Sequence, residues 1–119
     1  MNIVVLEGAL SSTPVTRQLA SGSVVVSLEV TTDIDGVSAS VPVAWFDPPA
    51  EVAWDAGQQL VIAGSVRRRF FRTGGITQSR TEVVAADIVE AGKRRQVQRV
   101  LRLAAEKLGG QPTPAVRST

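Results

Sequence analysis

An alternation of apolar and polar positions runs through the first three quarters of the chain and predicts β-strands. The clearest stretch is residues 23–32 (SVVVSLEVTT), in which four apolar side chains share one face: Val24, Val26, Leu28 and Val30. Similar patterns predict strands over residues 3–6, 38–46, 59–71 and 77–89, while residues 15–20 form either a short strand or a loop. Glycine-containing turns at 35–36 and 73–75 join neighbouring strands as hairpins.

Two segments depart from the strand pattern. Asp47 followed by two prolines supplies a helix cap and a first turn, and Gly57 supplies a stop, so a short helix is expected from Ala50 to Ala56. After Gly92 the apolar positions recur at helical spacing opposite a basic face, which predicts a carboxy-terminal amphipathic helix. Five strands with glycines at their bends favour an all-β fold closed into a small barrel.

The distribution of charge along the chain indicates a polyanionic partner. Residues 1–60 hold seven acidic residues and one basic residue, Arg17, whereas residues 61–119 hold twelve basic and four acidic residues. Such segregation makes a dipolar surface whose basic half attracts polyanions. The alternative is that the two halves neutralise each other across a folded sheet.

The composition argues against an enzyme. The chain has no histidine and no cysteine, so the usual general base and the commonest metal ligands are missing. Asp33 and Asp35 flank a turn, where aspartate is frequent for conformational reasons, so no metal site and no cofactor are expected. No apolar run approaches the ~20 residues that span a bilayer, and no signal pattern opens the chain. A cytoplasmic protein is therefore expected.

Residues 64–75 (GSVRRRFFRTGG) carry the candidate binding site. On a strand, Arg67, Arg69 and Phe71 point to one face, and Val66, Arg68 and Phe70 point to the other. Cations for phosphates beside a flat ring for a base are what single-stranded nucleic acid requires. Two further arginines at the hairpin ends are expected to extend the positive track: Arg72 and Arg80.

Alternatively, residues 64–75 form a solvated strand whose phenylalanines fill a core. Of the two rings, Phe70 is expected in the core and Phe71 at the surface.

From Met1 to about Gly92 the chain resembles the bacterial single-stranded DNA-binding proteins. The matching pieces, in order, are NIVVLEGAL, Pro14 followed by Arg17, VVVSLEV after Ser21-Gly22, AWF, Ala50-Glu51, GQQLVIAGSVRRRFF and TEVVAADI. The resemblance implies a five-stranded oligonucleotide-binding (OB) barrel over residues 1–92. It also implies a homotetramer assembled through the first strand, and coating of single-stranded DNA at the nucleoid in replication, recombination and repair.

The resemblance also assigns roles to individual residues. Arg67, Arg69 and Phe71 match the family's basic–x–basic–x–aromatic contact run, and Phe46 matches an aromatic residue on which a base stacks. Trp45 is then expected in the core, with Trp54 packing nearby.

The departures from the family pattern weaken the expected binding. The hairpin TTDIDGVSASV is short, carries aspartates and lacks the tryptophans expected there. The family's acidic, phenylalanine-tipped tail is replaced by a basic amphipathic helix over residues 93–110 and a segment, 111–119, expected to be flexible. The alternative function is therefore an OB-fold protein–protein assembly module, like the primosomal relatives of this fold, with weak nucleic-acid binding.

Overall fold

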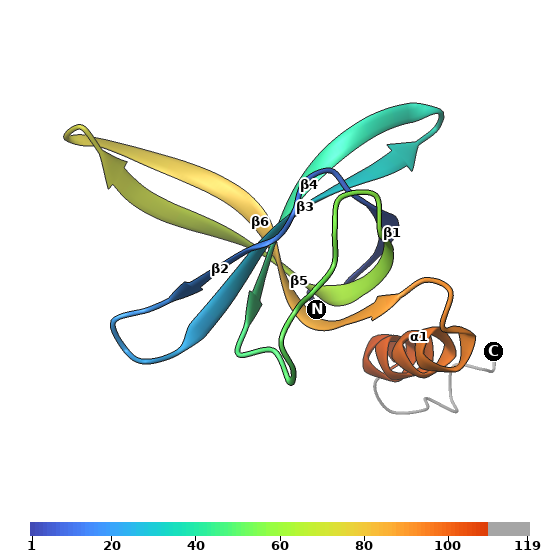
Figure 1. Ribbon diagram of the computed structural model, residues 1–119. Helices are drawn as coiled ribbons and strands as arrows, with labels where there is room; N and C mark the ends of the chain where they lie inside the picture. The colour runs from blue at the N-terminus through green and yellow to red at the C-terminus, as the bar shows by residue number, and fades with distance from the viewer. Residues whose placement is uncertain (110–119) are drawn as a thin grey trace.

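The computed structural model describes residues 1–109 (Figure 1). The elements in chain order are β1 (Val4–Leu10), β2 (Val15–Gln18), β3 (Val24–Ile34), β4 (Val37–Phe46), β5 (Gln59–Thr73), β6 (Ile76–Glu90) and α1 (Arg94–Gly109). The expected strands and the carboxy-terminal helix are therefore present. The segment 111–119, which was expected to be flexible, lies outside the described residues.

Five of the strands close into a barrel. The order around the sheet is β1-β5-β6-β4-β3, and β1 returns to β3 at Ala9 and Leu10 to complete the closure. All neighbours are antiparallel except β4 and β6, which pair in parallel at Val43 and Ala44. The short strand β2 pairs with the beginning of β3 and lies outside the closed ring. The fold is an OB-like barrel, as the pattern of strands predicts.

The core fills the inside of this barrel with alternate apolar side chains from every strand of the ring. Its most deeply buried members are Leu10, Val26, Val30, Leu60 and Ile62. Two glycines allow strands to approach closely, because a β-carbon on Gly8 would collide with the backbone oxygen of Thr31, and one on Gly64 with that of Val84. Gly64 also lies where the β5–β6 register shifts.

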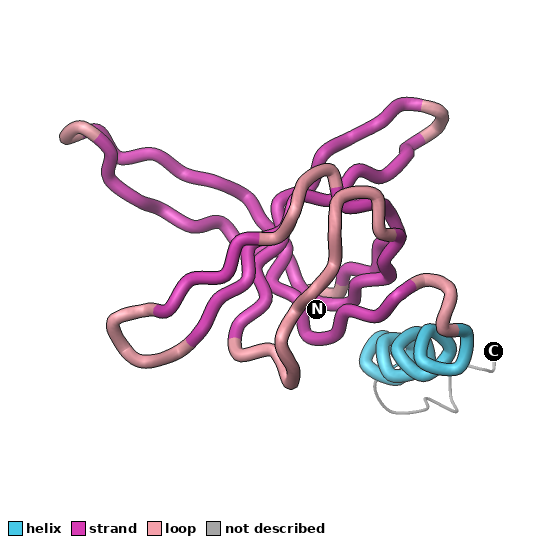
Figure 2. Tube along the Cα trace, in the orientation of Figure 1, coloured by secondary structure: helices cyan, strands magenta, loops and turns pink. Residues whose placement is uncertain are grey.

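The hairpins are longer than the barrel that they build, and their outer halves project into solvent (Figures 1 and 2). Along β5 the continuously buried residues run only from Leu60 to Ala63. Phe70 lies on the projecting part and is 67% exposed. The expectation that Phe70 belongs to the core is therefore wrong, because within residues 1–109 no second layer covers this end of the hairpin.

The helix expected from Ala50 to Ala56 is not formed. Asp47 instead joins β3: its backbone N–H donates to the Val24 carbonyl at 2.7 Å, and its Oδ1 accepts from the Val24 N–H at 2.9 Å. The following chain is irregular, with Val52 and Trp54 packed against the core between exposed neighbours. Packing of alternate side chains on the barrel thus overrides a helix too short to be stable by itself.

Trp54 fixes this loop to the barrel. Its ring stacks on that of Trp45, with centroids 6.1 Å apart and planes inclined by 6°. Its indole Nε1–H donates to Glu90 Oε2 at 3.2 Å. Trp45 is buried and Trp54 half-buried, which confirms the packing role expected for both.

The carboxy-terminal helix α1 packs on the outside of β5 and β6. Val100 and Ala104 are buried there, whereas Leu101 and Leu108 keep about half of their surface exposed. Within residues 1–109 no helix is long and apolar enough to cross a membrane.

Candidate nucleic-acid interface

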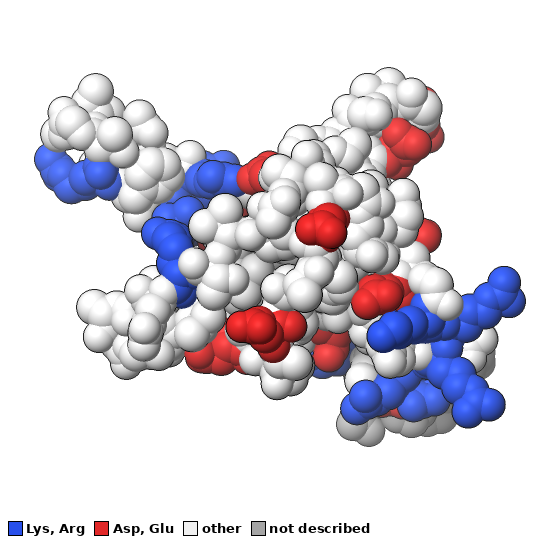
Figure 3. Space-filling view, in the orientation of Figure 1, with Lys and Arg blue, Asp and Glu red and all other residues white. Residues whose placement is uncertain are grey.

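Basic side chains gather in two places in Figure 3: between the β5–β6 hairpin and the β2–β3 loop, and along α1. The first place contains the candidate residues. The hairpin register pairs Arg67 with Glu82, Arg69 with Arg80 and Phe71 with Gln78. Because side chains alternate between faces, these three pairs share one side of the hairpin.

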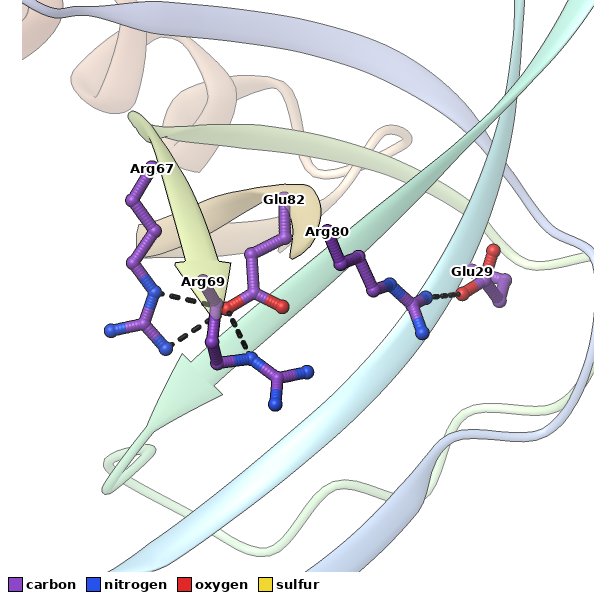
Figure 4. Close-up of polar contacts among 5 residues, drawn as sticks. All are labelled: Glu29, Arg67, Arg69, Arg80 and Glu82. Carbon is purple, nitrogen blue, oxygen red and sulfur yellow. Dashed lines mark hydrogen bonds and ion pairs between the residues drawn. The ribbon is translucent and has the colours of Figure 1, made fainter. Parts of the chain in front are cut away.

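A buried carboxylate holds two of the arginines together (Figure 4). Glu82 Oε2 accepts a hydrogen bond from Arg67 Nε at 2.9 Å, and it also lies 2.9 Å from Arg67 Nη2 and 3.4 Å from Arg69 Nε as ion pairs. The Glu82 side chain is 6% exposed, whereas each arginine side chain is 42% exposed. The carboxylate therefore anchors both guanidinium groups from below, while part of each still faces solvent.

Each of these guanidinium groups also lies over an aromatic ring. Arg67 Cζ is 5.1 Å from the ring centroid of Phe46, and Arg69 Cζ is 5.4 Å from that of Phe71. Both distances are within the range of cation–π attraction. Two cation–ring pairs thus follow one another along the surface, one at the end of β4 and the other on the projecting part of β5.

The first cation–ring pair borders an open groove. Its cavity, about 220 Å³, is lined by Arg17, Leu19, Val25, Ser27, Ala44, Phe46, Arg67, Arg69 and Glu82. A second hollow, also about 220 Å³, shares Ser27, Arg69 and Glu82 with the first and continues to Glu29 and Arg80. We call the two hollows together the basic groove. It crosses the outer surface of β2, β3, β4, β5 and β6.

The remaining candidate arginines differ in their surroundings. Arg80 lies in the basic groove, where its Nη2 is 2.6 Å from Glu29 Oε2. Ser40 donates a further hydrogen bond, at 3.1 Å, to the other oxygen of Glu29. Arg72 lies on the opposite face of the hairpin, and its Nη2 donates to the Gly75 carbonyl at 3.1 Å, which braces the turn. The structure thus brings together Arg67, Arg69, Arg80, Phe46 and Phe71, and leaves Arg72 apart.

The basic groove contains three charged residues that the sequence did not single out for a site. Arg17 reaches it from β2, and Glu29 and Glu82 supply its negative charge. Four guanidinium groups face two carboxylates, so the groove keeps a net charge of +2. Within residues 1–109 no group of three acidic, histidine or cysteine side chains could hold a metal ion.

No protein-family model matches the chain, and no curated protein is significantly similar to it in sequence. Fold and site define an OB-like barrel that carries a basic, partly aromatic groove. What such a groove can bind follows from its own geometry.

Proposed function

We propose that this protein binds single-stranded DNA without sequence preference in the basic groove. The observation that carries the proposal is the pair of guanidinium–ring contacts, Arg67 over Phe46 and Arg69 over Phe71, beside an open groove. Guanidinium groups bind phosphates through fork-shaped hydrogen bonds, and an aromatic ring stacks on any base. Coating of exposed strands in replication, recombination or repair is the role that such binding serves.

Selectivity for single strands follows from the rings. The bases of a duplex are stacked on one another and cannot reach Phe46 or Phe71, whereas unpaired bases can. Stacking on two rings contributes roughly 2–6 kcal/mol at roughly 1–3 kcal/mol per base. The carboxylates of Glu82 and Glu29 reduce the attraction for phosphate, so one chain alone should bind modestly.

We propose that several copies act together, with a homotetramer assembled through β1. Residues Val4 to Ala9 pair with β5 along one edge, but in the described part of the chain the other edge of β1 pairs with β3 only at Ala9 and Leu10. Val5 on this strand is 41% exposed and adjoins a hollow that also contains Leu101. An apolar, half-paired strand favours pairing with a second copy across a two-fold axis. Light scattering at micromolar concentration would test this, and a monomer mass would exclude it.

Titration of a labelled oligothymidine at several salt concentrations tests the binding proposal. Each phosphate contact on a single strand contributes about −0.7 to the slope of log K against log salt, so three or four contacts predict a slope of about −2 to −3 per chain. Arg67→Ala combined with Arg69→Ala should reduce the magnitude of that slope by roughly one to two units. Undetectable binding at low salt would favour the assembly-module alternative.

A further inference from the structure

Helix α1 carries a second basic surface, separate from the basic groove. Arg95, Arg99 and Arg102 follow one another at spacings of four and three residues, so they form one line along the helix. We call them the α1 stripe. All three are exposed, and within residues 1–109 none of them has an ion-pair partner. Around the stripe, Lys93, Arg94 and Lys107 are also exposed, whereas Glu106 is the one acidic residue of α1.

Helix stability does not account for the α1 stripe. Arg95 lies near the amino-terminal end of α1, where the helix dipole disfavours cations, and the first turn holds no acidic residue. Arg95 and Arg99 are four residues apart, a spacing at which like charges repel each other. Arg95 and Arg99 therefore carry positive charge at a cost to the helix, which a bound polyanion would offset, whereas Arg102 lies four residues before Glu106, a favourable spacing for opposite charges.

The opposite side of α1 limits what the polyanion can be. Val100 and Ala104 are buried against β5 and β6, so the barrel covers the centre of the apolar face, and only Leu101 and Leu108 at its edges keep about half of their surface exposed. A helix that lies in a membrane surface needs that face free to enter the lipid, which disfavours a membrane here. Guanidinium groups suit phosphates, and a line of them along a rigid helix suits the regular phosphates of a nucleic-acid backbone.

The α1 stripe also differs from the basic groove in what it lacks. Residues 94–109 contain no aromatic side chain, so α1 offers no ring on which a base could stack. Contacts to phosphates alone do not require unpaired bases. We propose that the α1 stripe is a second nucleic-acid site, which binds the phosphate backbone of a duplex.

The separation between the α1 stripe and the basic groove would allow one molecule to bind duplex and single-stranded DNA at the same time. In Figure 3 the basic side chains of α1 and those beside the β5–β6 hairpin lie at opposite ends of the view, with acidic side chains between them. A duplex on α1 and a single strand in the basic groove therefore do not compete for the same residues. One molecule can hold both at a junction between paired and unpaired DNA.

The test is a titration with a labelled blunt-ended hairpin duplex, compared with a labelled oligothymidine. The variant replaces Arg95, Arg99 and Arg102 by glutamine, which keeps good helix propensity. Duplex affinity should fall at least about ten-fold, and the slope of log K against log salt should shrink by up to about 2.7 units, at about 0.9 per lost contact. Helix content by circular dichroism should be unchanged.

The matched control removes the same number of charges from the basic groove by replacing Arg67, Arg69 and Arg80 with glutamine. It should weaken oligothymidine binding and leave duplex binding nearly intact. Equal loss of duplex affinity in both variants would show that only net charge matters, and unchanged duplex binding in the α1 variant would exclude the stripe; either result overturns the proposal.

Two further results are also decisive. Absence of duplex binding by the unmodified protein at low salt overturns the proposal. So does stripe-dependent binding to vesicles of anionic phospholipid while duplex binding stays unchanged, since this would assign α1 to a membrane. Failure of oligothymidine binding alone would reject the basic groove and leave the α1 site standing.

Discussion

Glu82→Gln should tighten the binding of single-stranded DNA while it destabilises the protein. The substitution keeps the shape of the side chain but removes the negative charge that Arg67 and Arg69 share. In the variant the two guanidinium groups present a net charge of +2 to a phosphate. In the unmodified protein the Glu82 carboxylate reduces that net charge to +1. Affinity and stability are thus expected to change in opposite directions.

The size of the binding effect follows from the repulsion between this carboxylate and a bound phosphate. At a separation of roughly 6 Å, that repulsion is about 0.7 kcal/mol at the dielectric constant of water and about 2.8 kcal/mol at an effective value of 20. Oligothymidine affinity at low salt should therefore rise by about 3-fold, and by up to about 100-fold if the groove is poorly screened.

The stability cost is smaller than for a fully buried ion pair. Removing one partner of a fully buried ion pair costs about 3–5 kcal/mol of stability, because the remaining charge is left buried and unpaired. Here each arginine side chain is 42% exposed and can turn toward water. A loss of about 1–2 kcal/mol is expected, which lowers the melting temperature by roughly 5–15 °C.

The assay combines thermal melts with oligothymidine titrations well below the melting temperature. Glu51→Gln is the matched control, because Glu51 is exposed in the loop after β4 and does not line the basic groove. It removes one negative charge and should change neither quantity much. Weaker binding by folded Glu82→Gln, with a smaller salt slope, would refute the reasoning, since it would mean that the carboxylate attracts or shapes the ligand site more than it repels phosphate.

Four further substitutions test the remaining parts of the structure. Phe71→Ala should weaken oligothymidine binding by roughly 1–3 kcal/mol. Phe70 lies on the opposite face of the hairpin, so Phe70→Ala should leave both oligothymidine affinity and melting temperature nearly unchanged. The reverse result would show that the other face of the hairpin binds DNA. Trp54→Ala should cost about 3–5 kcal/mol of stability through lost packing, measured by denaturant unfolding, with normal binding once folded. Gly64→Ala should lower the melting temperature sharply, because the new β-carbon meets a backbone oxygen that cannot move aside; an unchanged melt would show that the bulge can relax.

Much of the fold could be predicted because it follows from local alternation and turns. The glycines at 74–75 set a tight turn that pairs Thr73 with Ile76, and counting back along both strands pairs Arg67 with Glu82. The sequence therefore contained the signal for the buried acid beneath the two arginines, although only the basic and aromatic residues were singled out. The face that carries Arg67, Arg69 and Phe71 was predictable in the same way.

Other features depend on tertiary structure and were not predictable from local patterns. The position of Phe70 depends on where the barrel ends along a 15-residue strand, which only the closure of β1 on β3 decides. The segment from Ala50 to Ala56 has the cap and stop residues of a helix, but it forms an irregular loop because this allows Trp54 to pack on Trp45. Arg17 reaches the groove because β2 pairs with β3, a contact that its own neighbours in sequence do not specify.

The central claim is that single-stranded DNA lies in the basic groove, and arginine side-chain NMR tests it most directly. Addition of an unlabelled oligothymidine to isotope-labelled protein should shift the Nε–Hε signals of Arg67 and Arg69, since these groups now bind Glu82 and face the groove. The Nε–Hε signals of Arg68 and Arg72, on the other face of the same hairpin, should stay in place. Shifts confined to Arg68 and Arg72, or no shift in any arginine at saturating oligothymidine, would contradict the claim.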